Sequence, residues 1–99
     1  MTNTTNKYSF LIGWNNKTHK REIKKAINTL NNLKVLGFNV NKNLLGFWNN
    51  ERENSFSIEI ISNNDNPFND LNAIELKKQL EKNLNQFLVL TTKQEIEVL

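Results

Sequence analysis

The sequence predicts an α+β domain with one antiparallel sheet and two helices. Three observations predict it. Short segments alternate apolar and polar side chains with a period of two, two longer segments repeat apolar side chains at helical spacing, and their order is strand, helix, strand, strand, helix, strand. A chain of 99 residues has room for one domain. We therefore expect a single domain over residues 1–99, with a flexible N-terminus at 1–6.

The first strand is predicted over residues 8–14, where apolar side chains occupy alternate positions. These side chains are Tyr8, Phe10, Ile12 and Trp14. A polar turn follows, and Thr18 is expected to be the N-cap of the first helix. The apolar stripe of that helix comprises Ile23, Ala26, Ile27, Leu30 and Leu33. Gly37 is expected to mark the break after it.

The middle of the chain predicts two further strands. The second begins at residues 38–40 and resumes at 44–47, and the polar residues 41–43 between them predict a bulge or bend. Residues 48–52 are polar enough for a hairpin connection. The third strand is predicted over residues 55–60, where Phe56, Ile58 and Ile60 alternate with polar residues.

The last third of the chain predicts a loop, a helix and a strand. Residues 62–69 form the loop, and Asp70 is expected to cap the second helix. The apolar stripe of that helix comprises Ala73, Leu76, Leu80 and Leu84. The apolar run 87–90 suits a buried strand, and residues 94–99 either continue it or form an extra edge strand.

This βαββαβ order is the ferredoxin-like arrangement, in which right-handed crossovers place both helices on one face of the sheet. The expected core is Phe10, Ile12, Phe56, Ile58 and Ile60 against Ile23, Ile27, Leu30, Leu76, Leu80 and Leu84. The other sheet face is expected to carry Leu11, Gly13, Ser55, Ser57, Glu59 and Ile61. We expect a homodimer through this face or through an edge strand, because exposed leucine and isoleucine would otherwise add to apolar surface. A solvated face is the alternative.

Composition excludes several classes of chemistry. The chain has no cysteine, so disulfides, thiolate metal sites and cysteine nucleophiles are excluded. His19 is the only histidine, so a zinc site or a Ser–His triad is hard to assemble. We expect no metal and no cofactor. No apolar run approaches the roughly 20 residues of a membrane span, and no signal core is evident, so a cytoplasmic location is expected.

Basic side chains cluster on the first predicted helix: Lys17, Lys20, Arg21, Lys24 and Lys25. Such a cluster suits a nucleic-acid backbone or an acidic protein, and a solvated helix face is the alternative. RNA-binding sheets of this type carry stacking aromatic side chains on their central strands. The third strand here has Ser57 and Glu59 at those positions. This composition disfavours RNA recognition through the sheet.

Trp14 and Trp48 are candidate partner contacts, because tryptophan supplies a large contact area at low entropic cost. Each ends a predicted strand beside an asparagine-rich turn. We expect the two strands to end at opposite ends of the sheet, so the tryptophans are not assumed to form one site. Core packing is the alternative for each.

Two polar segments are candidates for ligand chemistry. Asn15, Asn16 and Lys17 precede a helix and could hold an anion at its N-terminus, although an ordinary capped turn explains them as well. Glu53 and Ser55 lie two residues apart on a strand near Trp48, and Glu51 precedes them. A buried carboxylate pair could transfer protons, and a solvated hairpin start is the alternative.

Five short motifs resemble those of a known family. They are Gly37–Val40, Gly46–Trp48, Glu53–Ser55, Gln86–Leu90 and the turn Gly13–Thr18. The first four are similar to motifs of the domain-of-unknown-function 3574 family and its small phage and mobile-element relatives, and the turn resembles that of the shorter members. Asn39 departs from the family, which favours Thr there, and the apolar pair at 87–88 departs from more polar residues. The resemblance implies a compact α+β fold and no assigned activity.

Three functions are compatible with these features. The favoured one is a small non-catalytic interaction protein, phage or mobile-element encoded, that binds and inhibits a host factor in the manner of a counter-defence or anti-CRISPR protein. Its partner would be a protein or a nucleoprotein, with nucleic acid contacted through the first helix. The second is a protein that sequesters a nucleotide or small anion at an oligomer interface with Lys17. The third is a dimeric ferredoxin-like monooxygenase or isomerase with Glu53 in an enclosed pocket.

Overall fold

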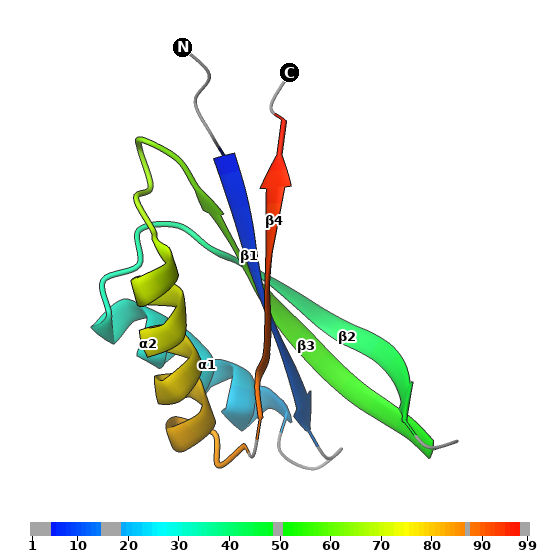
Figure 1. Ribbon diagram of the computed structural model, residues 1–99. Coiled ribbons are helices and arrows are strands. Elements are labelled where there is room, and N and C mark those ends of the chain that lie inside the picture. The colour runs from blue at the N-terminus through cyan, green and yellow to red at the C-terminus, as the bar shows by residue number, and fades with distance from the viewer. Residues whose placement is uncertain (1–4, 15–18, 49–50, 87, 98–99) are drawn as a thin grey trace.

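The computed structural model describes residues 5–14, 19–48, 51–86 and 88–97 (Figure 1). The elements are β1 (Thr5–Trp14), α1 (His19–Asn32), β2 (Asn39–Trp48), β3 (Glu51–Ser62), α2 (Asp70–Asn83) and β4 (Leu90–Ile96). The strands form a sheet in the order β2-β3-β1-β4, and every neighbouring pair is antiparallel. Figure 1 shows both helices on one face of this sheet. The predicted α+β ferredoxin-like fold is confirmed.

The core lies between the two helices and the central strands. Register pairs Phe10 with Ile58 and Ile12 with Phe56, so alternate residues of β1 and β3 share the helix-covered face. The buried apolar residues are Tyr8, Phe10, Ile12, Ile23, Ala26, Leu30, Phe56, Ile58, Ile60, Phe68, Ala73, Leu76, Leu80, Leu84 and Val89. The predicted core is confirmed except at Ile27, which is only partly buried. Phe68, from the loop before α2, completes it with its ring 5.1 Å from that of Tyr8.

Strand β2 contains the predicted bulge. The register shifts between Asn41 and Leu44, so one extra residue of β2 faces β3 there. The expected connection at 48–52 is too long, because β2 continues to Trp48 and pairs it with Glu51 of β3. The β2–β3 pairing therefore includes polar residues that were expected to form the turn between these strands.

The helix ends differ from prediction at two points. Asn69, not Asp70, caps α2, because its side chain accepts from the Asn72 backbone N–H at 2.8 Å while the Asn72 side chain accepts from the Asn69 N–H at 3.0 Å. This is a reciprocal capping box. The chain leaves α1 at Lys34, with φ of 58°, and not at Gly37. The proposed cap at residue 18 lies outside the described residues.

The predicted buried strand at 87–90 is wrong. Strand β4 begins only at Leu90 and lies at the edge of the sheet. Val89 is buried, but Leu88 and Leu90 are 57% and 53% exposed. In a continuous apolar run, apolar and polar residues do not alternate. The sequence therefore does not indicate where the connection ends and the strand begins.

Candidate functional site

The solvent side of α1 carries a cluster of four cations. The opposite side of this helix packs against the core through three buried residues, Ile23, Ala26 and Leu30. The exposed cations are Lys20, Arg21, Lys24 and Lys25, and we call them the basic face. These four side chains lie on the solvent side of the helix, as the sequence predicts. Lys17, the fifth basic residue of the predicted cluster, lies outside the described residues.

No ion pair to the basic face is found in the part of the chain that the structure describes. The ion pairs found among the described residues join Lys7 to Glu59, Lys77 to Glu81 and Lys93 to Asp70, and none involves α1. The acid of the first turn of α1, Glu22, is half-buried, and its Oε2 is shielded from solvent with no hydrogen-bond partner. Within the described part of the chain, these four positive charges therefore have no ion-pair partner.

The positions of these cations oppose helix stability. Lys20 and Lys24 are four residues apart, as are Arg21 and Lys25, and like charges at this spacing repel. They also occupy the first half of α1, where the helix dipole favours negative charge. The rest of the solvent side carries the exposed amides of Asn28, Asn31 and Asn32. Hydrogen-bond donors and positive charge thus cover the side of α1 that faces solvent.

The two tryptophans end strands at the same end of the sheet, which corrects the expectation that they end at opposite ends. Both β1 and β2 are antiparallel to β3, so β1 and β2 run in the same direction. Trp14 is level with Asn54, and Trp48 lies three residues beyond Leu45, which is also level with Asn54. At about 3.4 Å per residue this offset is about 10 Å along the sheet. The tryptophan side chains lie outside what the structure describes, so their contact with a partner stays a prediction.

Ser55 has a structural role in the sheet. It is buried, and its hydroxyl donates to the Leu44 carbonyl at 3.4 Å. Glu53 pairs with Gly46 and Glu51 with Trp48 in the β-ladder. The carboxylates of both glutamates lie outside the described part, as do Asn15 and Asn16, so the proton-transfer and anion hypotheses stay predictions. Within residues 5–14, 19–48, 51–86 and 88–97, no three acidic or histidine side chains gather as a metal site would need.

A titratable cluster that the sequence did not reveal joins three elements. The Tyr8 hydroxyl donates to Asp70 Oδ1 at 2.6 Å, and Lys93 Nζ lies 3.0 Å from the same oxygen. Burial, followed by the Asp70 carboxylate, raises the pKa of Tyr8 to about 12. The hydrogen bond from Tyr8 and that from Lys93 lower the pKa of Asp70. Tyr8 is thus a neutral donor at neutral pH that holds the start of α2 against β1.

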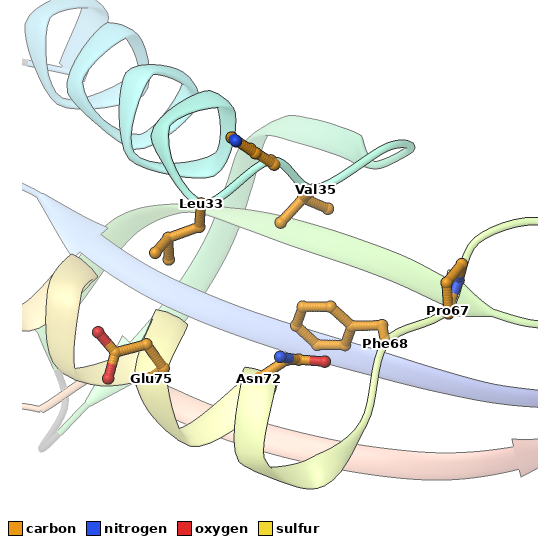
Figure 2. A pocket seen from close by; sticks show the side chains of 7 residues that line it. Leu33, Val35, Pro67, Phe68, Asn72 and Glu75 are labelled. Carbon is orange, nitrogen blue, oxygen red and sulfur yellow. The ribbon is translucent and has the colours of Figure 1, made fainter.

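A shallow pocket lies between the end of α1 and the loop before α2 (Figure 2). Its lining is Leu33, Lys34, Val35, Pro67, Phe68, Asn72 and Glu75. Its volume is about 130 Å³, whereas small-molecule sites usually measure roughly 300–1,000 Å³. This pocket is too small for a nucleotide, and Glu53 does not line it.

No protein-family model, curated protein or solved structure matches this chain. The resemblance to the domain-of-unknown-function 3574 family therefore stays a prediction. Neither helix of the described chain is both long and apolar enough to cross a membrane.

Proposed function

We propose that this chain is a small non-catalytic interaction protein that binds a nucleoprotein through the basic face of α1 and blocks it. The observation that carries the proposal is that none of the ion pairs found among the described residues involves Lys20, Arg21, Lys24 or Lys25. The contact is with phosphate groups of the partner. All three kinds of exposed side chain on this side of α1, namely lysine, arginine and asparagine, donate hydrogen bonds to phosphate oxygens.

The energetics of such a contact favour binding without sequence preference. Each cation that neutralises a phosphate releases a counterion, and log K falls with log salt by about 0.9 per contact on duplex DNA. Four cations therefore limit the slope to about −4. Binding at low salt should be strong and should weaken steeply as salt rises. Contacts to bases would be needed for sequence selection, and no such contact is part of the proposal.

The test compares two charge reversals with the same spacing. Arg21→Glu with Lys25→Glu changes the basic face, whereas Lys78→Glu with Lys82→Glu changes exposed lysines of α2. Each double variant moves the net charge from +3 to −1, because two lost positive charges and two added negative charges total −4. Fluorescence anisotropy with labelled duplex and single-stranded nucleic acid, over a salt series, measures the affinity.

We expect the α1 variant to lose at least tenfold in affinity and to have a flatter salt slope, while the α2 variant stays within about threefold of the original. Equal losses in both variants would mean that net charge alone drives binding, and the basic face would then have no special role. A pull-down with the same pair of variants extends the comparison to intact nucleoprotein complexes.

The two other functions depend on residues that the structure does not describe. Sequestering of a small anion rests on Lys17, and enzyme chemistry rests on the carboxylate of Glu53. No described feature favours either function over the interaction protein.

A further inference from the structure

The sheet face that the helices leave open contains an uncharged area spanning all four strands. We call this side of the sheet the open face. Register aligns Leu90, Leu11 and Ser57 in one row, and Gly13, Ser55 and Leu44 in the next. The three leucines are 53%, 40% and 36% exposed in the order Leu90, Leu11, Leu44. One leucine therefore projects from each of β4, β1 and β2, and the two serines of β3 lie between them.

The bulge in β2 places Leu44 on the open face. Asn41 faces Ser57, and with regular alternation residue 43 would face Ser55. The extra residue puts Leu44 opposite Ser55 instead. Without the bulge Leu44 would belong to the helix-covered side. A local departure from regular pairing thus brings an apolar side chain to an exposed position.

The polar side chains in this area are already hydrogen-bonded within the sheet. Ser57 Oγ accepts from Asn41 Nδ2 at 3.2 Å, and Ser55 Oγ donates to the Leu44 carbonyl. Both serines are only 8% exposed. Covering this part of the face would therefore leave neither serine hydroxyl unpaired, which removes the usual penalty for burying polar atoms.

We propose that the open face binds a second copy of this chain, sheet against sheet, about a two-fold axis that runs parallel to the strands between β3 and β1. A two-fold rotation about this axis reverses the strand order β2-β3-β1-β4 in the partner. Strand β1 therefore lies over the partner's β3, and β4 lies over the partner's β2. Leu11 then lies over the partner's Ser57, because the two residues are at the same level of the sheet. The exposed Leu11 side chain of each copy therefore packs against the small Ser57 side chain of the other copy, and this contact occurs twice in the dimer.

Charge also suits a second copy. On the open face Lys7 and Glu59 form an ion pair with an Nζ–Oε1 distance of 3.8 Å. They lie on β1 and β3, the two strands that the axis exchanges, so each comes near the opposite charge of the partner. Helix α1 lies on the side of the sheet opposite the open face (Figure 1), so in this arrangement the basic faces of the two copies lie on the outer sides of the dimer. Sheet-to-sheet packing therefore does not bring together the positive charge of the two copies.

The size of the open face is adequate for an interface of this kind. Four strands about 4.8 Å apart and about 30 Å long have a footprint of about 600 Å². Side-chain relief raises the accessible area toward the ~800 Å² per partner that stable complexes bury.

The first experiment measures mass in solution by light scattering coupled to size exclusion. We expect the original protein to show twice its chain mass of 11.6 kDa. Leu11→Glu with Leu90→Glu should give a monomer with an unchanged circular dichroism spectrum, because both side chains are exposed in the single chain. Leu71→Glu is the matched control, since Leu71 is 76% exposed on α2, and this variant should remain a dimer. A monomeric original protein, or a double variant that stays dimeric, would overturn the proposal.

The second experiment tests the axis and avoids charged substitutions. The chain has no cysteine, so single cysteines can be placed freely. A tagged Leu11→Cys protein is mixed with an untagged Ser57→Cys protein and treated with a short bismaleimide that spans the ~10 Å between packed sheets. We expect a cross-linked heterodimer to form at least tenfold faster than with Leu71→Cys in place of Leu11→Cys. Equal rates for the two mixtures would contradict this arrangement of the dimer.

Discussion

Helices α1 and α2 have the same length and the same spacing of buried residues, but their exposed side chains differ in charge. Each has 14 residues, and both lie on the same face of the sheet (Figure 1). Their buried residues have the same spacing, with Ile23, Ala26 and Leu30 in α1 and Ala73, Leu76 and Leu80 in α2. At the positions that correspond to the basic face of α1, helix α2 carries Asp70, Leu71, Ile74 and Glu75.

The charges of α2 follow the rules for a stable helix. It has a capping box, a lysine in the last turn, and an ion pair between Lys77 and Glu81 at 2.7 Å. Helix α1 has four cations in its first half and no base in its last turn. Folding alone would favour the α2 arrangement in both helices. The difference supports a role of the α1 surface outside folding.

The largest expected effect tests the shared framework. Leu30→Ala and Leu80→Ala each remove a fully buried side chain, and each should lower the free energy of unfolding by about 2–5 kcal/mol. Urea denaturation followed by circular dichroism measures both. If one substitution cost less than about 1 kcal/mol, the helices would not contribute equally to the core.

A smaller effect is expected at the N-terminus of α2. Asn69→Ala removes the acceptor for the Asn72 N–H and should lower stability by about 1 kcal/mol. Asn69→Ser restores an acceptor at the same position and is the control. The same denaturation curves give both values, and equal losses for alanine and serine would mean that the capping box adds little.

The carboxylates of α2 predict a dependence of stability on pH. The side chain of Lys77, then the N–H of Val89, lowers the pKa of Glu81, and Tyr8 with Lys93 lowers the pKa of Asp70. Because these pKa values are depressed in the folded chain, their stabilisation is present above the unfolded values and is lost as pH falls through the folded ones. Both carboxylates reach solvent, so we expect Glu81 to contribute less than about 1 kcal/mol.

Glu81→Gln tests this dependence directly. The variant should be less stable than the original protein at pH 7, and the difference should shrink as the pH falls below the pKa of Glu81. Thermal melts between pH 2 and 7 measure it. A gap of constant size across this range would contradict the linkage to protonation of Glu81.

The smallest expected effects have opposite signs in the two helices. Lys20→Glu adds a second acid to the first turn of α1, four residues before Lys24, and should raise stability by about 0.5 kcal/mol. Lys82→Glu puts an acid in the last turn of α2 and should lower stability by a similar amount. Melting temperatures at low salt compare the pair. If Lys20→Glu lowers the melting temperature, the basic face stabilises the fold and the contrast between the helices disappears.

Local patterns in the sequence predict most of this fold. The six elements and most of the core follow from periodicity, because burial on one side imposes a period of two on strands and 3.6 on helices. Element ends are less accessible, since several polar residues can serve as a cap. Both Asn69 and Asp70 suit that role in sequence, and only the backbone geometry selects Asn69.

Features that depend on distant residues were not predictable. Tyr8 and Asp70 are 62 positions apart, so their hydrogen bond requires the folded chain. A buried tyrosine hydroxyl needs a partner, which is the signal available in the sequence, but that signal does not name the partner. The basic face was predictable because its four cations are local to one helix. The prediction that Trp14 and Trp48 lie at opposite ends of the sheet is wrong, because the relative direction of β1 and β2 follows only from the pairing of both strands with β3.

The pairing of Thr5 with Ile96 has a practical consequence for handling the molecule. These residues bring the first and last described strands together at one end of the sheet, whereas α1 begins near the end where β1 finishes (Figure 1). A fluorophore or surface tether attached to a side chain at this end of the sheet would lie at the opposite end from the start of α1. Immobilised protein can therefore present its cationic helix to large complexes with little steric hindrance.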